Sequence, residues 1–260
     1  MGPAQIKTKI ISNKRFKDNY WHLEFESKSI AGSALPGQFV NIKVSGEAAP
    51  LLRRPLSIHK TCGSRVRLFY EVLGMGTRIL STRKPGEFLD VIGPLGNGFD
   101  LRSAISDKQQ AILVAGGMGV APLVFLAEKI KLKKPLVLIG AKTKKQVLCL
   151  QEFKALGCLV KIATDDGSSG FKGKVTDLLV QLLRPAPSAK RQAIYACGPR
   201  PMLKAISKIA CEKNIDSQLS LEEHMACGIG ACLGCVVPTV SGYKRVCKDG
   251  PVFSGRELNW

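Results

Sequence analysis

The stretch "AILVAGGMGVAPL", residues 111–123, joins an apolar run to a second apolar segment through three closely spaced glycines. The first part is short and mostly apolar, which is typical of a strand buried on both faces of a sheet. Gly116, Gly117 and Gly119 permit a tight turn, and the residues after them have a helix-like composition. A strand that passes through such a turn into a helix indicates an α/β architecture.

The same alternation continues through the middle of the chain. Further short apolar runs read "PLVLIGA" at 135–141, "LVKIATDD" at 159–166 and "QAIYACG" at 192–198. Helix-like stretches lie between or after them, at 120–131, 174–183 and 200–213. We therefore expect residues 101–218 to form an α/β domain with a parallel sheet covered by helices.

The first hundred residues have a different pattern of apolar and polar residues. Apolar side chains alternate with polar ones along three short segments, at Trp21, Leu23 and Phe25, at Val40, Ile42 and Val44, and at Val66, Leu68, Tyr70 and Val72. Period-two alternation broken by turn clusters predicts antiparallel strands, and helical periodicity is nearly absent. Residues 1–100 are thus expected to form a β-sandwich or β-barrel.

The last segment, residues 219–260, holds four of the nine cysteines. Their spacing is Cys227-x4-Cys232-x2-Cys235-x11-Cys247, and the first three follow the C-x4-C-x2-C pattern of plant-type [2Fe–2S] centres. Gly228, Gly230 and Gly234 would let the backbone wrap closely around such a cluster. Structural zinc, which usually pairs two C-x2-C motifs, and unligated cysteines are the alternatives.

The composition of the chain disfavours several classes of function. The formal net charge is +19, but the basic residues lie along the whole chain without a dense tract interleaved with aromatics, so we expect no nucleic-acid groove. The charge fits a solvated surface that attracts anionic ligands or an acidic partner protein. Neither a membrane span nor a secretory signal is expected, and clustered cysteines without a signal favour a cytoplasmic location.

Three short motifs could bind a nucleotide cofactor. The glycine turn after the strand at 111–115 would expose amides to a phosphate, although such turns also serve close packing, and Leu123 departs from the Rossmann fingerprint. The next turn carries Lys142, Lys144 and Lys145, either for a 2′-phosphate or simply solvated. Arg53, Arg54 and Ser57 could meet a pyrophosphate and a flavin edge, and Gly74, Gly76 and Thr77 could cradle phosphate at a helix start.

Cys197, Gly198 and Pro199 end the fourth buried run, where ligands of open α/β sheets bind. The Cys197 thiol is a candidate contact of a nicotinamide ring, with a buried structural role as the alternative. We interpret the remaining cysteines, Cys62, Cys149, Cys158 and Cys211, as small packing residues.

In this order, the motifs "RPLS", "GMGT", "GPLGNGF", "GGMGVAPL", "ATDDGS" and "ACGPRPML" resemble the ferredoxin–NADP reductase superfamily over essentially the whole chain. The tail, "CGIGACLGCV" with "YKRVCKDGPVF", is similar to one branch, the electron-transfer subunits of class 1B (NAD-linked) dihydroorotate dehydrogenases. The resemblance implies an FAD-binding β-barrel at 1–100, an NAD-binding α/β domain at 101–218 and a small [2Fe–2S] domain at 219–260.

The resemblance also implies site residues. FAD contacts would be Arg54, Pro55, Leu56, Ser57, Phe69, Tyr70, Glu71, Gly76 and Thr77, with Leu56 standing where many members have an aromatic ring. NAD contacts would be Gly116, Gly117, Gly119, Pro122, Asp165, Gly167, Cys197, Gly198 and Pro199. Cluster ligands would be Cys227, Cys232, Cys235 and Cys247.

The function implied by this resemblance is electron transfer in pyrimidine biosynthesis. An FMN-containing catalytic subunit would oxidise dihydroorotate, and electrons would pass through the [2Fe–2S] cluster and FAD to NAD⁺, in a heterotetramer with two of each subunit. This chain needs no general base for that role. An NAD(P)H–ferredoxin-type oxidoreductase subunit and a non-catalytic redox sensor are the alternatives.

Overall fold

A computed structural model describes residues 2–46, 49–104, 109–183 and 191–260. The chain divides into two compact units. The first consists of residues 1–98, 223–237 and 243–251, and the second of residues 99–222, 238–242 and 252–260. The cysteine-rich tail therefore contributes to both units, and the domain limits predicted at residues 100 and 218 stay predictions.

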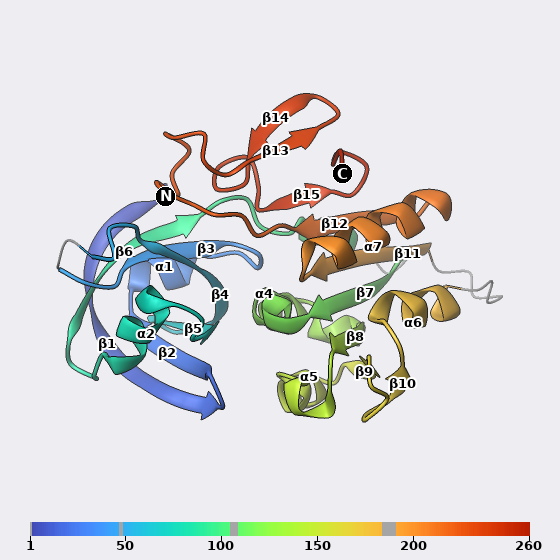
Figure 1. The fold of residues 1–260 in the computed structure, drawn as a ribbon, viewed down its shortest axis with the longest axis horizontal. Helices are drawn as coiled ribbons and strands as arrows, with labels where there is room; N and C mark the ends of the chain where they lie inside the picture. Colours follow the sequence, from blue (N-terminus) through green and yellow to red (C-terminus); the bar gives the residue numbers. More distant parts are fainter. Residues whose placement is uncertain (1, 47–48, 105–108, 184–190) are drawn as a thin grey trace. The chain divides into compact units, whose positions relative to one another are not determined.

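A closed six-stranded antiparallel barrel forms the first unit (Figure 1). Its strands, in the order β1-β2-β5-β4-β3-β6 around the barrel, are β1 (Ala4–Lys17), β2 (Tyr20–Glu26), β3 (Phe39–Lys43), β4 (Arg54–Cys62), β5 (Arg65–Glu71) and β6 (Phe88–Leu95). The predicted alternation is seen in β2, where Leu23 and Phe25 are fully buried and Trp21 is half-buried. Of the two architectures expected for this segment, the barrel is confirmed.

The barrel unit also contains two short helices, of which the sequence predicted the start of the second, at Gly74, Gly76 and Thr77, but not the first. They are α1 (Lys28–Ser33) and α2 (Met75–Thr82). The side-chain oxygen of Ser27 accepts a hydrogen bond from the backbone N–H of Ile30 at 3.2 Å and so caps α1. Both helices are too short for a periodic pattern to stand out, and only the Ser27 cap marks the first in the sequence.

A seven-stranded sheet lies at the centre of the second unit, in the order β10-β9-β8-β7-β11-β12-β15. The strands are β7 (Gln109–Gly116), β8 (Leu136–Ala141), β9 (Leu159–Thr164), β10 (Phe171–Lys172), β11 (Arg191–Cys197), β12 (Asp216–Ser220) and β15 (Val252–Ser254). All pair in parallel except β15, which runs antiparallel to β12. The predicted parallel sheet is confirmed.

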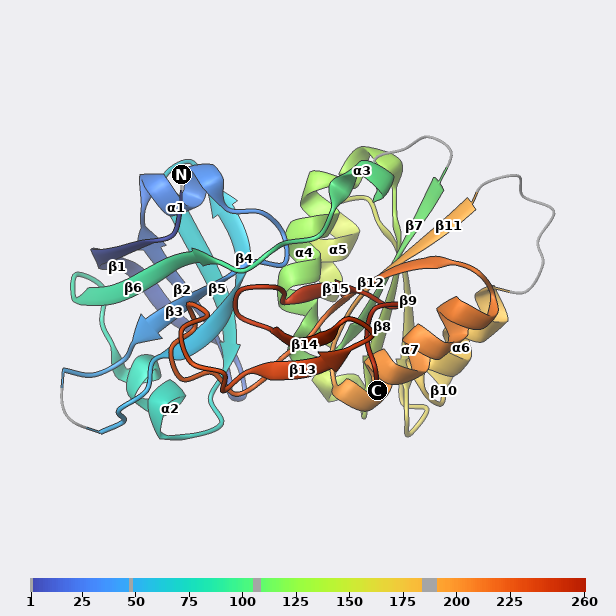
Figure 2. The same cartoon turned by 90° about the horizontal axis from the view of Figure 1, so that it is seen from above.

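Helices cover both faces of this sheet. They are α3 (Leu101–Ala104), α4 (Val120–Lys129), α5 (Leu150–Ala155), α6 (Val175–Leu182) and α7 (Arg200–Glu212). Figures 1 and 2 show α4 and α5 on one face and α6 and α7 on the other. Three of the helices, α4, α6 and α7, lie where the sequence predicted them. No helix in the described ranges combines the length and apolar character needed to cross a bilayer.

The order of the strands determines where a ligand can bind. From β7 the chain proceeds to β8 and β9 on one side, and then returns to place β11 on the other side of β7. The carboxyl ends of β7 and β11 therefore form the topological switch point, at which open α/β sheets bind ligands. In the tail, β13 (Val236–Thr239) and β14 (Gly242–Arg245) form a separate two-stranded sheet.

Candidate functional site

The four tail cysteines lie in the barrel unit and approach one another in two pairs. The Cys232 thiol donates a hydrogen bond to Cys227 Sγ at 3.3 Å, and the Cys232 N–H donates to the same sulfur at 3.3 Å. The Cys247 N–H donates to Cys235 Sγ at 3.4 Å. Cys235 and Cys247 are buried, whereas Cys227 and Cys232 are half-buried.

This pairing distinguishes between the metal centres that the spacing allows. In a tetrahedral zinc site with Zn–S bonds of about 2.3 Å, any two sulfurs lie about 3.8 Å apart. No three of these four sulfurs lie within 4.8 Å of one another. Two pairs of thiolates are the donor set required by two irons that share bridging sulfides, so the residues present fit a [2Fe–2S] cluster.

Backbone amides of the loop point at the sulfurs. Burial alone would raise the pKa of the Cys227 thiol, but N–H groups of Cys232, Ile229 and Ala231 outweigh it and lower this pKa to about 6. The Gly230 N–H donates to Cys247 Sγ at 3.1 Å. Gly228 and Gly230 adopt φ of +70° and +83°, a left-handed conformation that the wrapping loop needs and that favours glycine. The predicted role of these two glycines agrees with this geometry, whereas Gly234 has no positive φ and the prediction of a left-handed turn there is wrong.

Two further side chains hold the carbonyl groups of the same loop, and neither was predicted from the sequence. Asn41 Nδ2, on β3, donates to the Cys227 carbonyl at 3.2 Å. Arg245 Nη1, at the end of β14, donates to the Gly230 carbonyl at 3.0 Å. No spacing motif links Asn41 to the cysteines, because it lies 186 residues before Cys227.

The proposed flavin residues at the start of β4 are partly accessible. Arg54, Pro55, Leu56 and Ser57 are all half-buried, whereas Ile58 and His59 next to them are buried. A Cβ at Gly76 would lie 2.3 Å from Arg54 Nε, so only glycine lets the guanidinium lie against the start of α2. The structure thus brings Arg54 together with Gly76, and a guanidinium beside a helix N-terminus fits a pyrophosphate.

The other proposed flavin residues divide into accessible and buried groups. Thr77 Oγ1 accepts hydrogen bonds from the N–H groups of Leu73 and Gly74, at 3.0 and 3.3 Å, and shapes the turn before α2. Phe69 and Tyr70 are buried in the barrel, and burial raises the pKa of the Tyr70 hydroxyl, which donates to Asn13 Oδ1 at 3.1 Å. Burial also raises the pKa of Glu71.

The glycine turn and the Cys197–Pro199 segment meet at the switch point of the second unit. Cys197 pairs with Ala115 across β11 and β7. A Cβ at Gly119 would lie 1.9 Å from the Cys197 carbonyl oxygen, and one at Gly116 would lie 2.9 Å from Pro199 Cδ. Close packing, the alternative function of these glycines, is therefore confirmed for Gly116 and Gly119.

Gly117 differs from its neighbours, because its φ is +54° and nothing lies within 4 Å of an added Cβ. An open, left-handed glycine at the switch point leaves its backbone accessible to a ligand. Pro122 is buried in α4, and Gly198 lies between Cys197 and the exposed Pro199. These residues fit a dinucleotide that reaches the carboxyl ends of β7 and β11.

The segment with Asp165 and Gly167 follows β9, on the other side of β8 from the glycine turn. Asp165 N–H donates to the Ala141 carbonyl at 3.1 Å, and the next residue, Asp166, accepts from the Ser168 hydroxyl at 2.6 Å. Gly167 has φ of +76° and packs against Lys172. Asp165 and Gly167 therefore lie at the same sheet edge, two strands away from the switch point.

Burial raises the pKa of the Cys197 thiol to about 12, although Ser220 donates toward its thiolate and opposes the shift. At neutral pH the thiol therefore stays protonated. A neutral, half-buried thiol at the carboxyl end of β11 can contact a ligand ring but is a poor nucleophile.

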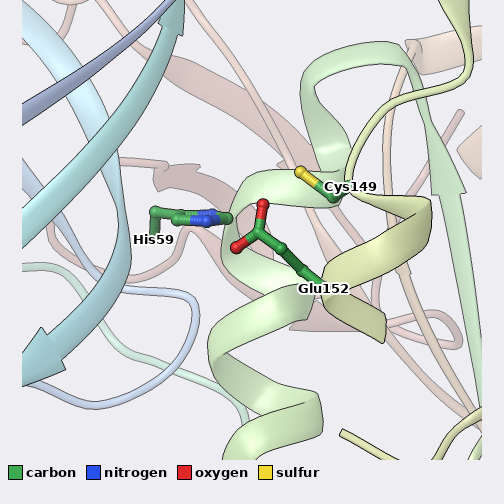
Figure 3. Close-up of side chains that lie close together, drawn as sticks. All are labelled: His59, Cys149 and Glu152. Atoms are coloured by element: carbon green, nitrogen blue, oxygen red, sulfur yellow. The ribbon is translucent and has the colours of Figure 1, made fainter. Parts of the chain in front are cut away.

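The remaining cysteines are only partly as predicted. Cys149 and Cys158 are buried, as expected of packing residues, but Cys62 and Cys211 are exposed, so the packing interpretation is wrong for those two. Figure 3 draws Cys149 and Glu152 at the start of α5, in the second unit, and His59, which belongs to the first unit.

Two family models match the chain. Residues 222–259 match the iron–sulfur cluster binding domain of dihydroorotate dehydrogenase B. Residues 113–208 match an oxidoreductase NAD-binding domain. The first covers all four tail cysteines, and the second covers the glycine turn and Cys197–Pro199.

Relatives extend the similarity to nearly the full length. The chain is 38% identical over 258 residues to the dihydroorotate dehydrogenase B (NAD⁺) electron transfer subunit of Caldanaerobacter subterraneus subsp. tengcongensis, covering 98% of each chain. It is 42% identical over 261 residues to the protein of the same name from a Geobacillus species, again covering 98% of each.

A solved structure of an NADH-dependent reduced ferredoxin–NADP oxidoreductase is 32% identical, with a TM-score of 0.84, and the match covers 97% of this chain and 90% of the other. The fold class predicted from the sequence is thereby confirmed.

Proposed function

Since the chain belongs to the family of dihydroorotate dehydrogenase B electron transfer subunits, we propose that it carries electrons from the oxidation of dihydroorotate to NAD⁺ in pyrimidine biosynthesis. It is an oxidoreductase subunit rather than a complete dehydrogenase, because the pyrimidine would be oxidised on a partner subunit. FAD, a [2Fe–2S] cluster and NAD are the cofactors that fit its residues. When bound, the cluster supplies single-electron steps, and FAD and NAD supply the hydride step.

The main support for the proposal is that the four tail thiols lie in two pairs. Cys227 with Cys232 and Cys235 with Cys247 would each hold one iron. The same compact unit contains the half-buried start of β4, so the proposed iron ligands and flavin residues share one unit. That shared unit supports electron transfer between a cluster and a flavin bound at these residues.

The chain's own residues hold and orient the cofactors. Arg54 and the start of α2 at Gly76 and Thr77 would bind the FAD pyrophosphate, and Pro55, Leu56 and Ser57 would line the isoalloxazine. Phe69, Tyr70 and Glu71 would support it from β5, with backbone contacts from the two buried aromatic residues. No side chain in this set has to move a proton, and the neutral Cys197 thiol agrees with a role in contact rather than covalent chemistry.

NAD would bind where β7 and β11 end. Gly116, Gly117, Gly119 and Pro122 would border its phosphates, and Cys197, Gly198 and Pro199 its nicotinamide. Asp165 and Gly167 would lie farther along the same edge.

The partner we propose is an FMN-containing catalytic subunit, assembled as two copies of each chain. The loop that carries Cys227, Cys232 and Cys235, called the cluster loop, supports a protein partner, because its Ile229 and Leu233 are 51% and 70% exposed although both are large and apolar. Exposed apolar side chains that flank half-buried ligand thiols favour a protein partner that covers them. A reducing compartment such as the cytoplasm suits an assembly that depends on thiolates.

Replacing one iron ligand tests the proposal. In the complex with the catalytic subunit, Cys227→Ala should abolish NAD⁺-dependent dihydroorotate oxidation and leave NADH able to bleach the flavin. Cys211→Ala is the matched control, because Cys211 is exposed on α7 and should be dispensable. Normal turnover of dihydroorotate with NAD⁺ by Cys227→Ala would contradict the proposed electron route.

A second candidate follows from the solved oxidoreductase structure that matches 97% of this chain. We propose as the alternative a subunit that exchanges electrons between a nicotinamide nucleotide and ferredoxin. Anaerobic isolation with native partners separates the two functions. An FMN-containing partner that oxidises dihydroorotate supports the first, and ferredoxin reduction without such a partner supports the second.

A further inference from the structure

Asn41 is a polar residue in an apolar place. It lies on β3 between Val40 and Ile42, and all three are fully buried. Its Nδ2 bonds the Cys227 carbonyl, while its Oδ1 is buried without a partner among the residues that the structure describes. An unsatisfied buried acceptor costs about 1–3 kcal/mol, so barrel stability by itself would favour an apolar side chain here.

The Asn41 amide also packs directly against the cluster loop. A Cβ at Gly228 would lie 2.4 Å from Asn41 Nδ2. The carbonyl of a trans peptide points away from its own N–H, so the bond to the Cys227 carbonyl turns the Gly228 N–H away from Asn41. Farther along the loop, the Gly230 N–H donates to Cys247 Sγ at 3.1 Å and the Cys232 N–H to Cys227 Sγ at 3.3 Å.

Arg245 contacts the same loop a few residues farther along the chain, at Gly230. Its Nη1 donates to the Gly230 carbonyl at 3.0 Å, and the N–H of the same residue, Gly230, donates to Cys247 Sγ at 3.1 Å. The guanidinium is itself fixed by Asp249, whose Oδ2 accepts from Arg245 Nε at 3.0 Å and from the Arg245 N–H at 2.8 Å. Gly230 is thus held at both of its backbone groups, by a guanidinium at its carbonyl oxygen and by a sulfur at its N–H.

We propose that Asn41 and Arg245 are positioning residues that hold the loop carbonyls so that the loop N–H groups stay directed at the cluster sulfurs, and that they raise the cluster's reduction potential in this way. N–H···S bonds stabilise the extra negative charge of the reduced cluster, and hydrogen bonds to the sulfurs are among the features that set such potentials. The inference rests on the proposed cluster.

The test measures the cluster midpoint potential in redox titrations followed by electron paramagnetic resonance, using the full chain purified anaerobically with its cofactors. Asn41→Leu removes the amide while keeping the volume, and Arg245→Lys keeps the positive charge while losing the planar fork. Thr8→Val is the control, because Thr8 is a buried β1 residue whose hydroxyl donates to the Glu26 carbonyl in the same unit.

The expected result is a shift to more negative potential in Asn41→Leu and in Arg245→Lys, with Thr8→Val at the wild-type value. Wild-type potentials in both loop variants, or an equal shift in Thr8→Val, would overturn the inference and leave the proposed function intact. If Asn41→Leu retains no iron, Arg245→Lys decides by the same criterion. A wild-type chain without iron would instead refute the proposed function, and this inference with it.

Discussion

Among the glycines that the structure describes in the α/β unit, Gly119 leaves the least room for a side chain. The position that a Cβ would occupy lies 1.9 Å from the Cys197 carbonyl oxygen and 2.3 Å from its carbon. Both are backbone atoms of β11, which is paired on each side by β7 and β12 and therefore cannot shift cheaply. The glycine turn after β7 is thus fixed by packing as well as by any phosphate.

Gly119→Ala should lower the free energy of unfolding by about 3 kcal/mol, at the upper end of the cost of overpacking, and should weaken NADH binding. Urea unfolding and a fluorescence titration with NADH measure the two effects. Gly32→Ala is the control, because nothing lies within 4 Å of its added Cβ and alanine is favoured in a helix. Equal stability of Gly119→Ala and the control would show that the turn is looser than described.

For single residues, the sequence predicts those contacts that join residues close together along the chain. Cys227, Cys232 and Cys235 lie in one loop, so their separation along the chain restricts their separation in space. The contacts of Asn41 and Arg245 with that loop depend instead on how distant strands meet it, and 186 residues separate Asn41 from Cys227. Contacts of that kind leave no local pattern in a single sequence.

The Asp90 carboxylate joins three parts of the barrel: β1, β6 and the segment before β4. Asp90, on β6, accepts from Arg53 Nη2 at 2.8 Å and from Gln5 Nε2, on β1, at 3.0 Å. Burial raises the pKa of Asp90, but the bonds from Arg53 and Gln5 outweigh it and lower this pKa below its ordinary value. Arg53 therefore has a structural partner within the barrel.

A carboxyl whose pKa is lower in the folded state stabilises the fold above its unfolded pKa of about 4, and this stabilisation is lost as the pH falls through the folded pKa. Asp90→Asn should therefore cost about 1 kcal/mol at pH 7, a modest value because the side chain is 34% exposed, and almost nothing near pH 2. Denaturant unfolding at both pH values checks this. If the difference in unfolding free energy between Asp90→Asn and the wild type is as large at pH 2 as at pH 7, the assigned role of the Asp90 carboxylate is contradicted.

Elements were predictable where their pattern is long and regular. The helices α4, α6 and α7 and the strands β7, β8, β9 and β11 have the expected places. Burial on both faces leaves an apolar run in β7, β8 and β11, whereas β9 exposes Leu159 and Lys161. The strand β12, "DSQLS", is polar in sequence although Ser217 and Ser220 are buried. It belongs to the sheet through pairing with β11, which no local periodicity reveals.

Function in the whole assembly would depend on the surface through which this chain binds the proposed catalytic subunit. Leu233 lies two residues before Cys235 and is 70% exposed. Leu233→Glu should place a charge in the proposed interface and weaken association with the catalytic subunit at least tenfold, which corresponds to about 1.4 kcal/mol, without loss of iron. Analytical ultracentrifugation with iron analysis measures both.

Leu132→Glu is the matched control, since Leu132 is 90% exposed in the other unit, between α4 and β8. It should leave the affinity unchanged. If Leu233→Glu binds the catalytic subunit as the wild type does, the cluster loop is not the docking surface.

The fold class and the cofactors of the whole chain could be predicted, because each depends on a recurring motif. The division of the tail between the two units could not. Residues 238–242 and 252–260 pack with the α/β unit, and the intervening segment with Cys247 packs with the barrel. The tail is too short to bury a core of its own, so tertiary contacts decide where each part packs.

The proposed electron route depends on iron held by the two thiol pairs. The most direct measurement is the iron, zinc and acid-labile sulfide content of the chain purified without oxygen. We expect about two irons and two sulfides per chain, the composition of a [2Fe–2S] centre, and their loss in Cys227→Ala but not in Cys211→Ala. One zinc per chain without sulfide, or iron that survives Cys227→Ala undiminished, would contradict it.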